Sequence, residues 1–96
     1  MKVFISQPMG GKTDEQIRQE RAALVMRLEE CGDTVVDSVF PDTPKDGNIP
    51  LRYLAKSIDL IAGVDKVIFM PGWEAARGCK IEHDCCAAYG VEIEYM

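Results

Sequence analysis

The chain has 96 residues, of which 47% are hydrophobic and 28% charged, and its formal net charge is −5. This length allows one domain with a single core, and the composition is that of an ordinary globular protein. The acidic balance is a poor match for a nucleic-acid backbone, and no apolar run approaches the roughly twenty residues of a membrane span. The amino terminus also lacks the apolar region of a signal peptide. We therefore expect a cytoplasmic single domain, residues 1–96, with no nucleic-acid or membrane partner.

The amino-terminal part predicts a strand and a helix joined by a glycine-bearing loop. Lys2 to Ser6 contains contiguous apolar residues and is predicted to be a strand. After the loop, Thr13 to Gln16 is typical of a capping box that opens a helix ending at Gly32. Its apolar stripe is expected to bury Ile17, Leu24, Leu28 and Cys31. Arg21 lies on the same stripe, where it either snorkels to solvent or turns inward toward an anion or a carboxylate.

The loop from Gln7 to Lys12 is a candidate anion site. Gly10 and Gly11 precede a helix N-terminus, where free amides and the helix dipole favour an anion such as phosphate, and Lys12 lies beside them. The loop matches neither of the common phosphate-binding glycine motifs. A plain strand-to-helix turn is the alternative interpretation.

The middle of the chain predicts a second strand, a long loop and a second helix. Asp33 to Asp37 is β-branched and short, and residues 38–48 are polar and contain prolines. A loop of this length in a small domain is more often functional than idle. Pro50 suits the first position of a helix that ends at Gly63, with a buried stripe from Leu51 to Ala62. Asp59 lies at the margin of that stripe, where a solvated flank is the simpler interpretation.

The carboxyl-terminal part predicts a strand, a loop and a helix, followed by an edge strand. Residues 67–70 are an apolar run, Pro71-Gly72 ends it, and a helical pattern continues to Gly90. On a helical wheel Glu82 falls within the apolar arc, together with the side chains Ile81, Cys85, Ala88 and Tyr89. A carboxylate that faces the sheet there must be paired, protonated or placed at a cleft; the alternative is a glutamate at the edge of the arc whose side chain reaches water. Residues 91–95 alternate apolar and charged side chains, as an edge strand does.

The four cysteines include no CxxC pair. Cys79, His83 and Cys86 are able to share one helix edge as metal ligands, but small core thiols explain them better, so no metal and no cofactor is predicted.

The element order β-α-β-α-β-α-β predicts an α/β domain. With right-handed crossovers it gives a three-layer, Rossmann- or flavodoxin-like fold, with a four-stranded parallel sheet in the order 2-1-3-4 and helices on both faces. Its topological switch point lies between the first and third strands, where ligands bind in such sheets. The loops 7–12, 71–77 and 38–48 are expected to meet there, with Glu82 and Asp59 approaching from the helices.

Two stretches of the chain also carry a resemblance. The first, residues 5–12, is Ile-Ser-Gln-Pro-Met-Gly-Gly-Lys, and the second runs from Asp65 through Phe-Met-Pro-Gly-Trp-Glu to Arg77-Gly78 and Glu82. Together they resemble a small family of phage and bacterial domains, the DUF4406-like proteins. These are similar in turn to nucleoside 2-deoxyribosyltransferases and deoxynucleoside-monophosphate N-hydrolases. The likeness covers nearly the whole chain and implies a single domain of that kind.

The resemblance implies a function in nucleoside chemistry. Glu82 would attack the anomeric carbon of a (deoxy)nucleoside or its monophosphate, and the leaving base would be protonated by a second acid. Catalytic roles are implied for Glu82, Asp59 and Asp65. Substrate contacts are implied for Ser6, Gln7, Gly10, Gly11, Lys12, Gly72, Trp73, Arg77 and Gly78. The relatives are oligomers, so we expect a homodimer or larger homo-oligomer that acts on a small molecule.

The loop that contains Trp73 and Glu74 leaves the activity open. Trp73 and Glu74 occupy a loop that is small in many relatives, so a nucleotide-binding or sensing module without turnover is the alternative function. Trp73 itself has three possible positions: stacked on a base, at a protomer interface, or packed in the core, which is the commonest fate of a lone tryptophan. The identity of the base, the need for a 5′-phosphate and the choice between hydrolysis and transfer are left open as well.

Overall fold

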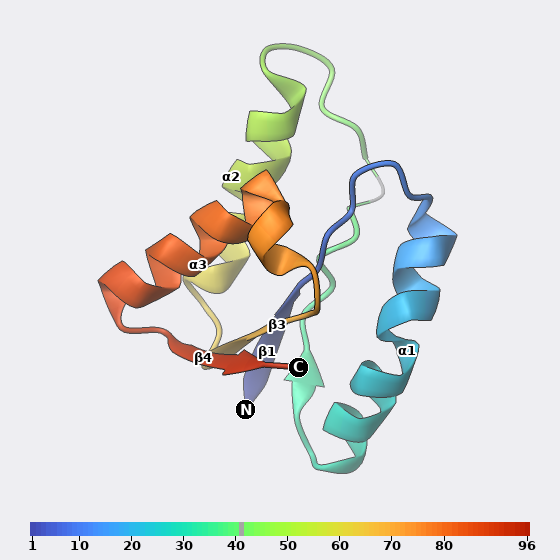
Figure 1. Cartoon of the computed structure of the whole chain (residues 1–96), viewed down its shortest axis with the longest axis vertical. Helices are drawn as coiled ribbons and strands as arrows, with labels where there is room; N and C mark the ends of the chain where they lie inside the picture. The colour runs from blue at the N-terminus through green and yellow to red at the C-terminus, as the bar shows by residue number, and fades with distance from the viewer. Residues whose placement is uncertain (41) are drawn as a thin grey trace.

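The computed structural model describes residues 1–40 and 42–96, which form one four-stranded parallel sheet with helices on both faces (Figure 1). The strands are β1 (Lys2–Ser6), β2 (Thr34–Val35), β3 (Lys66–Phe69) and β4 (Glu92–Tyr95), in the spatial order β2-β1-β3-β4. The helices are α1 (Asp14–Glu30), α2 (Ile49–Ile61) and α3 (Arg77–Tyr89), and a 3-10 turn, η1 (Trp73–Ala75), precedes α3. The predicted α/β fold and the order 2-1-3-4 are confirmed.

The central strands β1 and β3 are buried on both faces, which explains their continuous apolar runs. Alternate side chains face opposite layers. Val3, Ile5 and Ile68 pack with Leu24 and Leu28 of α1. On the other face, a second cluster joins β1 and β3 to α2 and α3, and its buried members are Phe4, Ile61, Val67, Phe69 and Cys86. The helices thus form two outer layers, with α1 alone on one side of the sheet (Figure 1).

The predicted helix boundaries are largely confirmed. Thr13 accepts a hydrogen bond from the amide of Gln16, and the Gln16 side chain accepts one from the amide of Thr13, which completes the capping box. Gly90 ends α3 in the left-handed conformation with φ 69°, as a terminal glycine does. The second strand is shorter than predicted, because only Thr34 and Val35 pair with β1.

Several residues of the predicted buried stripes are exposed in the structure. Cys31 is exposed because it is the C-cap of α1 and lies beyond its last buried turn. Leu51 is exposed because α2, with 13 residues, is about 20 Å long, whereas the strands that it covers span only about 13 Å. Ala55 of α2 and its C-cap Ala62 are also exposed, and so are Ile81, Ala88 and Tyr89 of α3.

The rotation of α3 has a packing reason. Its inward face is Cys79, Glu82 and Cys86, and Cys86 packs in the cluster that contains the rings of Phe4 and Phe69. These two rings occupy the core below the helix, and the small Cys86 thiol is fully buried against them. The prediction that Glu82 turns inward is confirmed, although its predicted neighbours on the helix are not.

Candidate functional site

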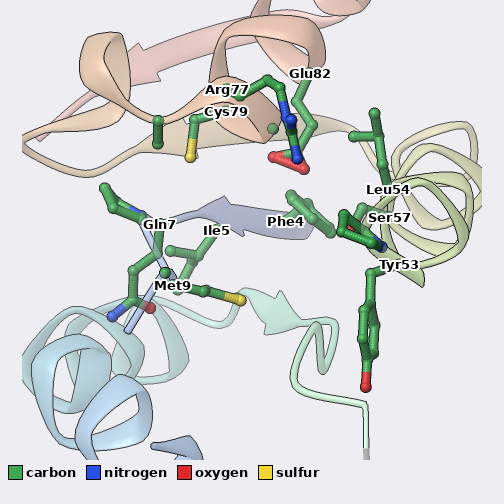
Figure 2. Close-up of a pocket in the computed structure, with 15 residues that line it drawn as sticks. Phe4, Ile5, Gln7, Met9, Tyr53, Leu54, Ser57, Arg77, Cys79 and Glu82 are labelled. Carbon is green, nitrogen blue, oxygen red and sulfur yellow. The ribbon is translucent and has the colours of Figure 1, made fainter. Parts of the chain in front are cut away.

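A cleft of about 390 Å³ opens at the carboxyl ends of β1 and β3 (Figure 2). Its floor is formed by β1, one wall by α2, and the opposite wall by the beginning of α3. The residues that line it include Phe4, Ile5, Tyr53, Leu54, Ser57, Arg77, Gly78, Cys79 and Glu82. This is the switch point, where β1 and β3 are neighbours in the sheet and the chain leaves them in opposite directions. We call this cleft the first chamber.

Glu82 is the side chain of chemical interest in the first chamber. It is only 7% exposed, and Ser6, the last residue of β1, donates a hydrogen bond of 2.8 Å from its Oγ to Glu82 Oε1. Figure 2 shows the Glu82 carboxylate directed toward the cleft from α3. Among the described residues no ion pair joins Glu82 to Arg21 or Arg77, so its charge is held by a neutral hydroxyl alone.

Burial sets the protonation of this carboxyl group. Desolvation raises the pKa of Glu82 from 4.5 to about 7, and the hydrogen bond from Ser6 lowers it in part. Near neutral pH Glu82 is therefore present in both its charged and its neutral form. The neighbouring thiols respond to the same surroundings: burial raises the pKa of Cys79, and burial together with the Glu82 carboxylate raises the pKa of Cys86 to about 11. Both thiols are thus neutral and weakly nucleophilic.

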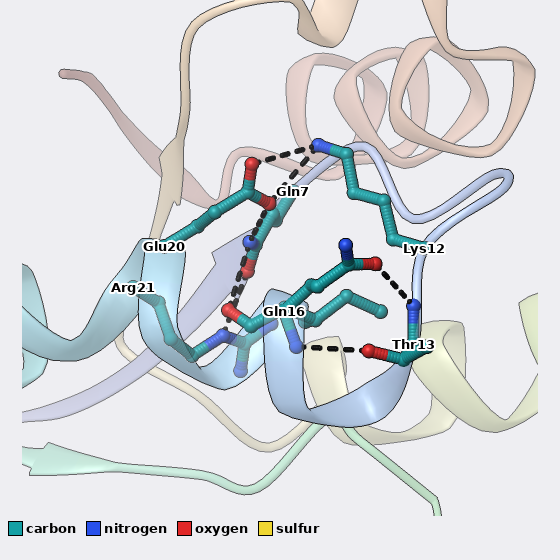
Figure 3. Close-up of polar contacts among 7 residues, drawn as sticks. Gln7, Lys12, Thr13, Gln16, Glu20 and Arg21 are labelled. Atoms are coloured by element: carbon teal, nitrogen blue, oxygen red, sulfur yellow. Dashed lines mark hydrogen bonds and ion pairs between the residues drawn. The ribbon is translucent and has the colours of Figure 1, made fainter.

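Gln7 and Arg21 form a buried polar network below the loop that follows β1 (Figure 3). Gln7 donates from Nε2 to the carbonyl of Ile17 and to Glu20, and its Oε1 accepts a bond of 2.8 Å from Arg21 Nε. Arg21 therefore turns inward, but its partner is an amide rather than a carboxylate. Gln7 lines the first chamber, as predicted, but its amide group is bonded to residues of α1, so we assign the amide to holding the loop; substrate contact by Gln7 stays a prediction.

The loop from Gln7 to Lys12 offers less to a bound anion than the sequence predicted. Lys12 is already paired with Glu20, with Nζ 3.0 Å from Oε1, so its charge is neutralised within the chain (Figure 3). Gly10 lines the first chamber, whereas Gly11 lines neither of the chambers described here. Gly11 has a φ of 74°, which only glycine adopts at low cost, and this favours the turn interpretation for that position.

A second chamber of about 430 Å³ adjoins the first and shares part of its wall, including Gly10, Tyr53 and Ser57. Its other walls come from the start of α1 and from the segment after β2, where Ser38, Val39 and Phe40 line it. The rings of Phe40 and Tyr53 lie nearly parallel, with centroids 6.4 Å apart. The prediction that the loop after β2 reaches the switch point is therefore correct for these described residues.

The two predicted catalytic aspartates lie away from Glu82. Asp65 precedes β3, and its Oδ2 accepts a bond of 2.7 Å from the amide of Lys2 at the start of β1. It therefore lies at the amino end of the sheet, about 13 Å along β1 from Ser6. Asp59 is exposed and lines a separate depression with Arg52 and Lys56. Glu82 is consequently the one carboxylate among the described residues that line the first chamber.

Trp73 and Gly72 also lie outside both chambers. Trp73 stacks on His83, with ring centroids 4.3 Å apart, and it contacts Phe69 and Tyr95. Trp73 is partly buried and packs against the cluster that contains Phe69, which favours packing over stacking on a base; its place at a protomer interface stays a prediction. Gly72 begins the η1 turn with a φ of 89°, next to Pro8. Both residues shape the segment that leads into α3.

Arg77, Gly78 and Cys79 do line the first chamber, as predicted for the first two. They form the first turn of α3, and the N-cap residue Ala76 supplies no side-chain hydrogen bond to it. Arg77 is exposed and is the cation of the first chamber. Tyr53, Ser57 and Ser38 were not predicted as site residues. The only signal for the first two is their spacing of four residues, which gives them a common face of α2.

The described residues contain no group of three histidine, cysteine or acidic side chains arranged to hold a metal ion. Within the described ranges 1–40 and 42–96, no helix combines the length and the apolarity needed to cross a membrane.

A comparison with protein families places the chain. The model of one family, described as "Domain of unknown function (DUF4406)", matches residues 1–95. The chain belongs to the DUF4406 family. No curated protein matches it in sequence. Family membership and fold are thus known for this DUF4406 domain, but neither gives its chemistry. The chemistry has to be argued from the residues of the first chamber.

Proposed function

We propose that this DUF4406 domain cleaves or exchanges the N-glycosidic bond of a (deoxy)nucleoside or nucleoside monophosphate, with Glu82 as the nucleophile. The observation that carries the proposal is the position of Glu82: 7% exposed, lining a cleft at the switch point, and hydrogen-bonded through one oxygen to Ser6. A buried carboxylate beside a cleft is costly for stability, so its presence there indicates a functional role.

The proposed step uses the charged form of Glu82. One carboxylate oxygen forms a bond to the anomeric carbon of the sugar while the bond from that carbon to the base nitrogen breaks, and the electron pair leaves with the base. Ser6 holds Oε1 by its hydrogen bond of 2.8 Å and so fixes the direction of the carboxylate. Water then hydrolyses the sugar–glutamate ester, or a second base attacks it, which gives hydrolysis or transfer.

The departing base must gain a proton. The resemblance assigns proton transfer to Asp59, but Asp59 lies outside the first chamber and offers no support for that role. Since the described lining residues contain no second carboxylate, the proton in this proposal comes from water. Arg77, exposed at the mouth of the cleft, is able to attract an anionic group such as a 5′-phosphate.

The missing second acid favours one alternative, a nucleotide-binding module without turnover. Such a module needs the two chambers but not the reactivity of Glu82. A small molecule remains the proposed partner in both cases. The expected homo-oligomer remains a prediction, and sedimentation of the purified chain tests it.

The test is a panel of deoxynucleosides and their monophosphates, with released base measured by chromatography. We expect release by the wild type, and loss of at least a hundredfold in Glu82→Gln, which keeps the shape and the acceptor for Ser6. Glu29→Gln, an exposed change on α1, is the matched control. Equal release by wild type and Glu82→Gln would refute the nucleophile. Stabilisation by a nucleotide without any release would favour the binding module.

A further inference from the structure

The hydroxyl of Ser38 is a hydrogen-bond donor that the described protein leaves without an acceptor. Ser38 is only 2% exposed, and its Oγ accepts a bond of 2.9 Å from Arg21 Nη1. Because a guanidinium nitrogen only donates, the Ser38 proton must be directed elsewhere. No described residue accepts it, and Ser38 lines the second chamber. The Ser38 proton is therefore free to be donated to an acceptor atom of a ligand in the second chamber.

Arg21 orients the Ser38 hydroxyl and places a positive charge beside it. Its Nε bonds Gln7 and its Nη1 bonds Ser38, so that one rigid group fixes both segments. The third nitrogen, Nη2, is buried and has no partner among the described residues. Asp37, the acid that acts on Arg21 electrostatically, is exposed and paired with Arg18. The positive charge of Arg21, which no described ion pair neutralises, favours a ligand atom with negative partial charge near Ser38 and disfavours a donor such as an amino group.

The rest of the second chamber suits a planar ring. The rings of Phe40 and Tyr53 line it, together with Ile17, Val39 and Ile49. Lys12, the cation in its described lining, is paired with Glu20 and is matched there by Asp14, so the lining offers no unpaired cation to a phosphate group. Aromatic and apolar walls with a few polar groups, Ser38 among them, are typical of a site that binds a heterocycle.

We propose that the second chamber binds the base of the substrate, and that the Ser38 hydroxyl, positioned by Arg21, selects bases with a hydrogen-bond acceptor, such as a keto oxygen, at the edge that it contacts. This inference rests on the proposed function for the chemical class of the ligand. It adds a specificity-determining residue, Ser38, and a positioning residue, Arg21, at a chamber separate from the Glu82 carboxylate.

Binding, rather than turnover, is the decisive measurement. The probes are two pairs of monophosphates that differ in a keto or amino group at one ring position: 2′-deoxyinosine against 2′-deoxyadenosine, and 2′-deoxyuridine against 2′-deoxycytidine. Calorimetric titration gives the dissociation constants for wild type and Ser38→Ala. In at least one pair we expect the wild type to prefer the keto compound by about tenfold, and Ser38→Ala to bind both compounds equally.

The ratio within a pair separates a specific role from a structural one, because general damage to the chamber weakens both compounds alike. Thr34→Ala removes a hydroxyl from exposed β2 and is the control that keeps the preference. Arg21→Met is expected to lose the preference as Ser38→Ala does; if Arg21→Met does not fold, Ser38→Ala alone decides. Equal binding of both compounds by the wild type, no binding of either, or a preference retained in Ser38→Ala overturns the inference.

The two proposals fail in different ways. A keto preference that depends on Ser38, without release of base, supports this inference and counts against the nucleophilic role of Glu82. Release of base that depends on Glu82, without a keto preference, supports the proposed function and overturns the role of Ser38.

Discussion

Replacing Glu82 with glutamine is expected to stabilise the protein at alkaline pH and to have little effect in acid. The glutamine keeps the size of the side chain, and its amide oxygen still accepts the hydrogen bond from Ser6. What it removes is the cost of holding a carboxylate charge at a position that is 7% exposed. The change therefore isolates one term, the desolvation of the charge.

The size of the effect follows from the pKa. Glu82 has a pKa of about 7 in the folded protein against an ordinary value of 4.5. Each pKa unit is worth about 1.4 kcal/mol, so the charge costs up to about 3 kcal/mol of folding stability. Below pH 4.5 both states are protonated and the cost is absent. Between pH 4.5 and 7 the folded state holds a proton that the unfolded state has lost, so stability falls as pH rises. Above pH 7 the full cost is present.

The assay is urea unfolding of wild type and Glu82→Gln, followed by circular dichroism at several pH values between 5 and 8. The free energy of unfolding of Glu82→Gln minus that of the wild type should rise across this range, by up to about 3 kcal/mol at pH 8. With an m-value of about 1–3 kcal/mol/M, the midpoint moves by about 1 M or more. Titration of other groups cancels in the difference, and Glu29→Gln serves as the control. A difference that stays flat, or that falls with pH, would refute the reasoning.

Three further predictions follow from the same contacts. Ser6→Ala removes the hydrogen bond that lowers the pKa of Glu82, so the pH dependence of stability should move to higher pH in the same unfolding experiment; a shift to lower pH contradicts the assigned role of Ser6. If Glu82 acts as the nucleophile, kcat/KM for base release should fall about tenfold per unit of pH below about 7, and a rate that rises in acid would instead identify it as a general acid. Thr13→Ala breaks the capping box and should lower the free energy of unfolding by about 1 kcal/mol in urea titrations, while an unchanged value would mean that α1 does not depend on its cap.

Much of the fold was predictable because the signals for it are local. The apolar runs of β1 and β3, the Thr13 capping box and the terminal Gly90 each act within a few residues of sequence. Right-handed crossovers then reduce the strand orders for three consecutive β-α-β units to a handful, which include the observed order. The rotation of each helix about its own axis was not predictable from the sequence. A helix turned by one residue, about 100°, exchanges its inward side chains, and this is how Ile81 and Tyr89 came to be exposed on α3.

The candidate site, too, was predictable in one part and not in another. The position of Glu82 on the inward arc of its helix was visible in the sequence, because few charged residues interrupt that arc. The sequence contains no such signal against Asp59 and Asp65. Asp59 is on a helix beside the cleft but lies on its outer surface. Asp65 precedes a central strand but lies at the amino end of the sheet, opposite to the cleft. A carboxylate carries no local signal of which end of a strand, or which side of a helix, its partners occupy.

The sequence by itself determined a parallel α/β domain with an inward glutamate after its third strand. Only the tertiary structure decided that this glutamate is held by Ser6, that Arg21 bonds Gln7 and Ser38, and that Trp73 packs on His83. Hydrogen-bond partners of this kind are 14 to 76 residues apart in the chain. They depend on how each helix is rotated and how far it extends past the sheet, which follows from the fit of large and small side chains in the core.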